Sequence, residues 1–396
     1  MHKIILKRCL LLVLLSFSLT SCVNKSSSLN EISVKLNLIP QPNYLKTYQE
    51  KFIIDKETPI FYLESSEALK KQADLIQSII LEHVGLKLAI KPFTKTPEEG
   101  FIIKLNQENE DDVSEESYNI TINLESTLIS APSPKGIFYA VQTLRQLLLS
   151  DHQESPKKDF IELTCLEIND VPRFSYRGMM LDPARHFIPA ADIKKYIDAI
   201  ALYKFNTLHL HLSDDQGWRI EIKKYPKLME LASIRKETDG DGKPHGGYYT
   251  QEELKDIVAY AKERFIEVIT IPGVSNNLVC AGNEKVFEFY GNVISELSEI
   301  FTAEKFHIGG DEAPLDHWLT CPKCIKRKTD NNLGSPQHLM SYFFERISDT
   351  LATHGKTPQI WYELDVPFYP ETSTMYAWRG GLTPKTIEKS REMGYK

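Results

Sequence analysis

The sequence predicts an α/β protein in which a small α+β domain precedes an incomplete barrel of parallel strands. Strand and helix patterns alternate from residue 172 onward, and polar residues recur where the predicted strands end. Repeated βα units favour a parallel sheet, and this many in series favour a (β/α)8-type TIM barrel. Only about six strands can be counted, whereas a complete barrel has eight.

The barrel elements are read from apolar runs separated by turn residues. We expect strands at 176–181, 207–212, 267–271, 306–309, 359–362 and 374–378, and helices at 191–204, 251–264, 284–301, 337–354 and 384–393. In such barrels the chemistry takes place at the C-terminal ends of the strands. The polar and aromatic residues expected at those ends are Asp182, Arg185, Asp214, Asp215, Asp311, Glu312, Glu363, Trp378 and Arg379.

The stretch 36–168 mixes strands with helices and is predicted to be an α+β domain. Residues 52–54, 101–105 and 118–122 read as strands, the last alternating with a period of two. Residues 136–149 form an amphipathic helix pattern whose apolar stripe we interpret as core. The stripe consists of Phe138, Val141, Leu144 and Leu148. A turn at 169–172 separates this domain from the barrel domain at 172–396.

The first residues have the pattern of an export signal. Positive residues precede an apolar run at 10–19 that is too short to span a bilayer comfortably. The run ends in Leu-Thr-Ser-Cys, which resembles a bacterial lipoprotein signal cleaved before Cys22. We expect a signal peptide at 1–21, lipid attachment at Cys22 and a flexible tether at 22–35. The chain would then be anchored to the cell envelope, in the periplasm or on the cell surface. The alternative is an ordinary secretory signal with an incidental cysteine.

Charge and cysteine content exclude some classes of function. The net charge is -7 and no basic cluster lies outside the N-terminus, so nucleic acid is not an expected partner. Cys321 and Cys324 form a single CxxC, which without a second pair is a weak indication of zinc. A local disulfide suits an exported protein better. His209 and His211 face the same side of a strand and could bind zinc, but we favour satisfied interior histidines. No metal or cofactor is predicted.

The run at 306–312, Phe-His-Ile-Gly-Gly-Asp-Glu, is the strongest functional signal. Glycines let a ligand approach the backbone closely, and the sequence offers no packing role for this pair. Two neighbouring acids at a strand end can hold different protonation states, as acid–base chemistry on a sugar requires. The alternative, ranked second, is a strand end with two surface acids. Asp311 and Glu312 are therefore the predicted catalytic residues.

Several motifs resemble glycoside hydrolase family 20, the β-N-acetylhexosaminidases. They are Pro-Arg-Phe-Ser-Tyr-Arg-Gly at 172–178, Leu-Asp-Pro-Ala-Arg-His-Phe at 181–187, the run from His-Leu-His to Gly-Trp-Arg at 209–219, and His-Ile-Gly-Gly-Asp-Glu at 307–312. Residues 39–42 and 136–140 are similar to the α+β domain that precedes the barrel in this family. The resemblance covers nearly the whole chain after the signal.

The resemblance implies hydrolysis of terminal β-linked N-acetylglucosamine or N-acetylgalactosamine from glycans, with retention and without a cofactor. The mechanism is substrate-assisted, an exception to the scheme with two enzymic carboxylates. Asp311 would orient the acetamido group and stabilise an oxazolinium-like intermediate. Glu312 would protonate the leaving oxygen and then activate water. It must begin protonated, which an anionic neighbour and a dry pocket favour.

The resemblance also implies residues that bind the sugar. Arg185 would clamp sugar hydroxyls with its directional donors, and Asp214 would support the substrate site. Trp361 and Trp378 would form apolar walls, with a place in the barrel core as the alternative reading of both.

The sequence departs from the family in three places. The carboxylates that follow the third strand in the family are absent, and Val274 stands where a histidine is expected. An internal deletion would explain both differences. Without this histidine, Asp214 would lose the partner that it has in the family. Residues 361–363 read Trp-Tyr-Glu where the family usually has Trp-Asp-Glu, and the last two strands are not found. Two alternatives therefore stay open: a catalytically impaired surface glycan-binding lipoprotein, or a truncated gene product. Sugar preference and oligomeric state are not predicted.

Overall fold

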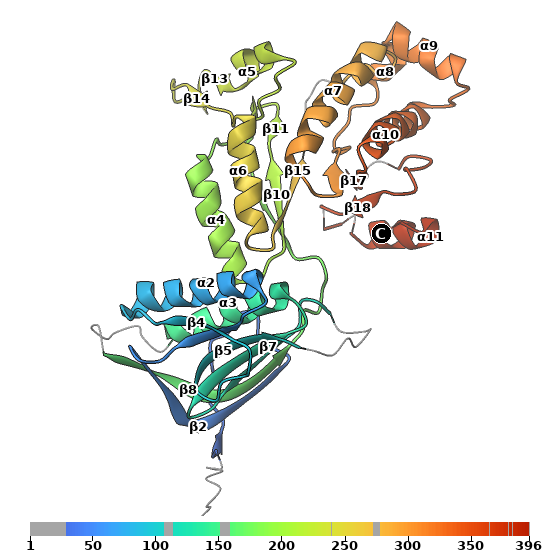
Figure 1. Ribbon diagram of the computed structural model, residues 1–396. Helices are drawn as coiled ribbons and strands as arrows, with labels where there is room; N and C mark the ends of the chain where they lie inside the picture. Colours follow the sequence, from blue (N-terminus) through green and yellow to red (C-terminus); the bar gives the residue numbers. More distant parts are fainter. Residues whose placement is uncertain are drawn as a thin grey trace, which may run out of the picture.

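The computed structural model describes residues 29–106, 114–150, 159–238, 240–271, 278–363, 365–378, 380–381 and 383–395. The predicted signal peptide, Cys22, Val274 and Arg379 lie outside these ranges, as does part of the tether. A sheet domain lies at one end of the molecule, next to a second, larger lobe of alternating strands and helices (Figure 1). No helix in the described ranges is both long and apolar enough to cross a membrane.

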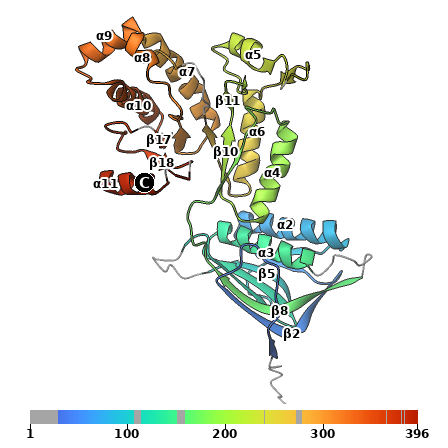
Figure 2. The ribbon, with the colours of Figure 1, turned by 180° about the vertical axis from the view of Figure 1, so that it is seen from behind.

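The first domain is an eight-stranded mixed sheet with the strand order β1-β2-β8-β6-β7-β5-β3-β4. Two helices, α2 (Glu67–Val84) and α3 (Pro134–Ser150), lie between this sheet and the second lobe (Figures 1 and 2). The strands are β1 (Glu31–Ile32), β2 (Tyr44–Asp55), β3 (Ile60–Leu63), β4 (Ile90–Phe93), β5 (Gly100–Leu105), β6 (Tyr118–Ile122), β7 (Ser126–Ala131) and β8 (Phe160–Asp170).

Local sequence explains these elements. In β6, side chains alternate between buried and half-buried positions, as the period-two pattern predicts. The four residues of the predicted stripe on α3 are all buried in the main apolar cluster, which confirms that the stripe is core. α2 begins at Ser66, whose side chain accepts the Leu69 N–H, and ends at Gly85, which adopts a φ of 86°.

The second lobe contains the six predicted strands, all parallel to their neighbours, with boundaries within a few residues of those expected. They are β9 (Gly178–Leu181), β10 (Thr207–His211), β15 (Glu267–Ile271), β16 (Lys305–His307), β17 (Thr357–Trp361) and β18 (Thr374–Tyr376). The five predicted helices are also present: α4 (Ala190–Leu202), α6 (Gln251–Lys262), α7 (Glu284–Ile300), α10 (Pro336–Thr353) and α11 (Thr383–Met393).

Several short elements of this lobe are not predicted from the sequence. They are the hairpins of β11 (Ser213–Asp214) with β12 (Gly217–Trp218) and of β13 (Ile234–Arg235) with β14 (His245–Gly246), and the helices α5 (Pro226–Ala232), α8 (His317–Thr320) and α9 (Pro322–Asp330). Each is shorter than the window of about 11 residues over which a hydrophobic period is counted, so pattern analysis does not identify it.

The six parallel strands of the described residues do not form a closed barrel, so the structure confirms the repeated parallel βα units of the prediction and not the barrel itself. They form two three-stranded sheets, β15-β10-β9 and β16-β17-β18. β15 and β16 contact each other, but no ladder joins them in the part of the chain that the structure describes. Side chains of both strands, Thr270 and Phe306, line a cavity at this junction.

A buried ion pair joins the two lobes. Asp170, at the end of β8, accepts hydrogen bonds from the Tyr118 hydroxyl at 2.7 Å and from the Lys204 ammonium at 3.5 Å. Lys204 follows α4, is 4% exposed, and also donates to the Tyr118 hydroxyl at 2.8 Å. Burial lowers the pKa of Lys204 to about 8. The cation is therefore held in the interior by one carboxylate and one phenol.

We expect Asp170→Asn to destabilise the chain by about 3 kcal/mol, because removing one partner leaves a buried charge uncompensated. Urea denaturation at pH 7 measures the effect, and Asp159→Asn, at an exposed aspartate just before the other end of β8, is the matched control. The double variant Asp170→Asn, Lys204→Met removes both charges and should recover much of the loss. A double variant no more stable than Asp170→Asn would contradict this explanation.

Candidate active site

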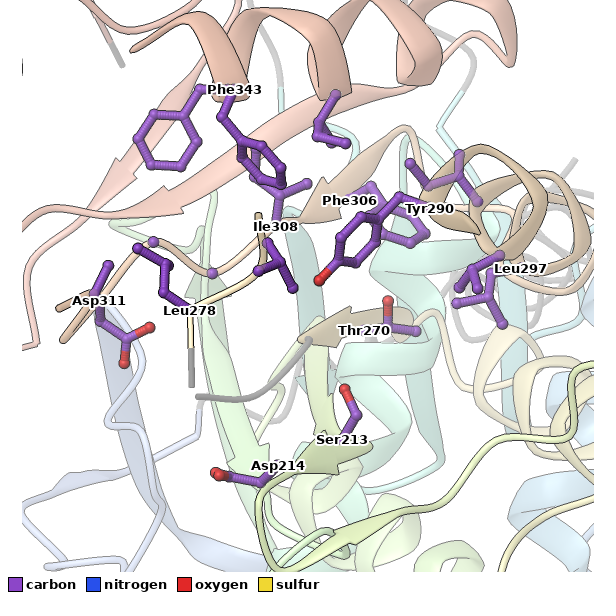
Figure 3. A pocket seen from close by; sticks show the side chains of 18 of the residues that line it. Ser213, Asp214, Thr270, Leu278, Tyr290, Leu297, Phe306, Ile308, Asp311 and Phe343 are labelled. Carbon is purple, nitrogen blue, oxygen red and sulfur yellow. The ribbon is translucent and has the colours of Figure 1, made fainter. Parts of the chain in front are cut away.

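A cavity of about 340 Å³ lies between the two sheets of the second lobe. Its polar lining comes from strand ends and includes Ser213, Asp214 and Asp311, while its apolar lining includes Phe306 and Phe343 (Figure 3). Asp214 belongs to β11 and Asp311 follows β16, so residues about 100 positions apart in the chain, 214 and 311, share one cavity. The structure thereby brings together two of the predicted site residues.

The two glycines before Asp311 have a structural role that the sequence does not reveal. Gly309 and Gly310 have φ values of 74° and 102°, which favour glycine. A Cβ at Gly310 would lie 2.7 Å from the Phe344 ring. The view that this pair has no packing role is therefore wrong: the glycines turn the chain tightly against α10. Both also line the cavity, as close approach of a ligand requires.

Asp311 and Glu312 lie in different environments. Asp311 is half-buried, and burial together with the charges of Glu363 and Glu312 raises its pKa to about 6. Glu312 is exposed and adopts a φ of 48°, a strained value for a residue with a side chain. The dry environment expected around Glu312 is thus found around Asp311, because it is Asp311 that faces the apolar cavity.

Glu363 is a site residue that the predicted set does not include. It follows β17, and its Oε2 accepts the backbone N–H of Glu312 at 2.9 Å. This bond ties the predicted acid–base residue to the next strand and puts a third carboxylate near Asp311. The only signal in the sequence was its position at the C-terminal end of a predicted strand.

A charged network surrounds Arg185. Its guanidinium contacts Asp182 at 2.8 Å and Asp214 at 3.0 Å. The His211 ring lies between the same carboxylates, with Nδ1 3.1 Å from Asp182 and Nε2 3.3 Å from Asp214. Burial favours a higher pKa for Asp182, but the His211 ring and the Arg185 guanidinium outweigh it and lower the pKa. Burial raises the pKa of Asp214.

This network gives Asp214 two partners, while position 274, where the sequence has valine and not the expected histidine, lies outside the described residues. His211 and Arg185 both reach it, from β10 and from the loop after β9. Asp182 and His211 are further residues that the predicted set omits. The Arg185 side chain is 46% exposed while its guanidinium is held by two acids, so the group is oriented and still accessible to a ligand.

An aromatic cluster fills the interior beside the site. The Trp361 ring lies 4.6 Å from the fully buried His307 and 5.9 Å from Tyr376. Burial lowers the pKa of His307 well below its usual value, and its neutral Nδ1 accepts the Gly309 N–H at 3.0 Å. His307 thus fixes the glycine turn that presents Asp311. Trp361 is part of this interior cluster, whereas Trp378 is 42% exposed.

The interior histidines have protein partners. His209 Nε2 lies 3.0 Å from the Tyr176 hydroxyl, and burial lowers the pKa of His209 to about 4. His211 is paired with the two aspartates of the network. Among the described residues, neither histidine belongs to a group with metal-ligand spacing.

Comparisons with family models agree with the motifs. The model "Glycosyl hydrolase family 20, catalytic domain" matches residues 174–273 and 270–396, and "Glycosyl hydrolase family 20, domain 2" matches residues 35–171. The two catalytic-domain matches overlap at 270–273, at the C-terminal end of β15.

Individual proteins give the same result. The chain is 40% identical to a β-hexosaminidase of Akkermansia muciniphila over 311 residues, which are 70% of this chain and 62% of that protein. It is 37% identical to a β-hexosaminidase of Porphyromonas gingivalis over 396 residues, which are 92% of this chain and 50% of that protein. The chain thus spans between half and two thirds of the length of these relatives.

Solved structures show the same fold. A family 20 exo-β-N-acetylglucosaminidase of Vibrio harveyi, in complex with N-acetylglucosamine, superposes with a TM-score of 0.80 at 26% identity, covering 93% of this chain and 61% of that one. A β-N-acetylhexosaminidase of Bacteroides fragilis gives a TM-score of 0.76 at 26% identity, covering 90% and 74%. With its catalytic-domain and domain 2 matches, its motifs and its fold, the chain belongs to glycosyl hydrolase family 20.

Proposed function

We propose that this chain is an exo-acting β-N-acetylhexosaminidase that releases terminal N-acetylglucosamine or N-acetylgalactosamine from glycans with retention of configuration. The observation that carries the proposal is the Gly-Gly-Asp-Glu turn after β16, which sets Asp311 at a cavity and holds Glu312 beside it through Glu363. The relatives named above support the substrate class.

The residues divide the chemistry as follows. The acetamido oxygen of the substrate attacks the anomeric carbon as the glycosidic bond breaks, and Glu312 donates a proton to the leaving oxygen. Asp311, ionised above about pH 6, stabilises the positive charge on the oxazolinium-like intermediate. Glu312 then removes a proton from the water that opens this intermediate. Arg185, oriented by Asp182 and Asp214, donates to sugar hydroxyls.

We further propose that the two three-stranded sheets are parts of a (β/α)8-type TIM barrel, with Trp361 and Trp378 near the sugar. The parallel strands, the helices between them and the position of Asp214 and Asp311 at strand ends support this architecture.

Hydrolysis of the p-nitrophenyl β-glycosides of N-acetylglucosamine and N-acetylgalactosamine by the purified chain tests the proposal. NMR should show that the β-anomer of the free sugar forms first, because a retaining mechanism inverts configuration twice. A folded chain that binds N-acetylglucosamine without hydrolysing either glycoside would favour the glycan-binding alternative instead.

We also propose export and lipid anchoring through Cys22, on the grounds of the N-terminal sequence alone. Expression in a bacterium fed radiolabelled palmitate should label the wild-type chain and leave Cys22→Ser unlabelled. Equal labelling, or none in either chain, would contradict the anchor.

A further inference from the structure

Three cysteine thiols from two separate segments meet beside the active site. The Cys280 sulfur lies 3.4 Å from that of Cys321 and 3.6 Å from that of Cys324, and these pairs are 41 and 44 residues apart in sequence. All three sulfurs lie within 4.8 Å of one another. No disulfide joins them: all three are free thiols, so the local disulfide predicted for the CxxC is not found.

The backbone around the thiols is packed to hold them in this arrangement. Cys321 caps the N-terminus of α9, which places Cys324 within the first turn. Gly282 lies so close to this turn that a Cβ there would be 2.2 Å from the backbone carbonyl of Lys323. The indole of Trp318, in α8, donates to the Val279 carbonyl at 2.9 Å and fixes the segment that carries Cys280. The convergence of the thiols is therefore supported from both sides.

The spacing of the sulfurs fits a metal ion. Zinc–thiolate bonds of about 2.3 Å in a tetrahedron put the sulfurs about 3.8 Å apart. A disulfide needs about 2.05 Å between two sulfurs and leaves the third thiol without a role. Simple packing explains a buried thiol such as Cys324, but Cys280 and Cys321 are partly exposed. The two half-exposed thiols and the buried third thiol could bind a cation from three sides. The fourth coordination position of the cation would then face the solvent.

We propose that Cys280, Cys321 and Cys324 bind one zinc ion or a similar thiophilic cation, with the fourth position open to water. Among the described residues, this is the one group of histidine, cysteine or acidic side chains with metal-ligand spacing. The proposal goes beyond the glycosidase activity and does not depend on it.

The position of this three-cysteine site gives it a structural purpose. Leu278 and Val279, just before Cys280, line the cavity, and α8 follows the Asp311-Glu312 turn after a few residues. The ion would join one wall of the cavity to the segment that follows the two acids. Structural zinc sites stabilise small loop-rich regions of this kind, because the metal binds the folded form.

Elemental analysis of the chain, purified without chelator from cells supplied with zinc, tests the proposal. We expect close to one zinc ion per chain in the wild type and in Cys165→Ala, whose cysteine is buried in β8 away from the site. Cys280→Ala and Cys321→Ser should lose at least nine tenths of the zinc. Zinc retained in both variants would overturn the assignment of ligands.

Two measurements on the wild type test the metal site without relying on variants that could fail to fold. Cobalt added to the metal-free chain should give thiolate-to-cobalt charge-transfer absorption and the intense ligand-field bands of a tetrahedral site. Zinc added to the same chain should raise the midpoint of thermal unfolding in proportion to the logarithm of its concentration. If no metal is found and the unreduced chain has two fewer reactive thiols than the reduced chain, two of the cysteines form a disulfide and the metal proposal is wrong. Absence of metal with every thiol reactive would leave only packing.

Discussion

Glu312→Gln is expected to lower kcat/KM for a natural β-linked N-acetylglucosamine disaccharide by about 10²–10⁴, because it removes the proposed general acid. The loss should be smaller for the p-nitrophenyl glycoside in the first step, because p-nitrophenolate leaves without being protonated. Comparing the two substrates therefore distinguishes loss of an acid from general damage to the site. Circular dichroism and thermal unfolding should match the wild type, since Glu312 is exposed.

Glu304→Gln is the matched control for this experiment. Glu304 is also exposed, but it lies at the opposite end of β16 from the proposed chemistry. It should retain wild-type activity on both substrates. If Glu312→Gln lost the same factor on the disaccharide and the aryl glycoside, or if Glu304→Gln lost as much, the acid–base role of Glu312 would be wrong.

Asp311→Asn is expected to lower kcat/KM by about 10²–10³, because a neutral amide stabilises the developing positive charge less well than a carboxylate. In the wild type, kcat/KM should fall about tenfold per pH unit below about pH 6, where Asp311 becomes protonated. This acidic limb should be absent from the residual activity of Asp311→Asn. An acidic limb at the same pH in that variant would assign the titration to another group.

The raised pKa of Asp311 also makes the free energy of unfolding depend on pH. A carboxyl whose pKa is higher in the folded than in the unfolded chain stabilises the fold in its protonated form. That contribution is present below the unfolded pKa of about 4 and is lost as the pH rises through about 6. Asp311→Asn should therefore be more stable than the wild type at pH 7.5, with a smaller difference at pH 4, as measured by urea denaturation.

Glu363→Gln separates the charge of Glu363 from the other causes of the raised pKa of Asp311. Burial of Asp311 is unchanged in this variant, and the amide oxygen can still accept the Glu312 N–H. The negative charge that helps to raise the pKa of Asp311 is lost, so the acidic limb should move to lower pH. A limb that does not move would leave burial and the charge of Glu312 as the causes.

Much of the fold could be predicted because the long elements carry their own signals. The amphipathic stripe of α3 and the apolar runs of β10 and β15 identify core-facing helices and buried parallel strands from local sequence alone. The short hairpins and α8 and α9 are shorter than the window of about 11 residues over which such a period is counted. They form because the surrounding chain holds them in place.

For the site, the sequence by itself indicated the family and predicted Asp311 and Glu312 as the catalytic pair, because Gly-Gly-Asp-Glu is a contiguous motif. Only the tertiary structure decided which acid faces the cavity, since that cavity is lined by Asp311 together with side chains from β16, α7 and α10. It also supplied His211 and Arg185 as partners of Asp214, and Glu363 as the partner of the Glu312 backbone. The meeting of Cys280 with the CxxC was likewise hidden in the sequence. Such contacts join residues far apart in the chain, and a local pattern carries no information about which distant segments the fold brings together.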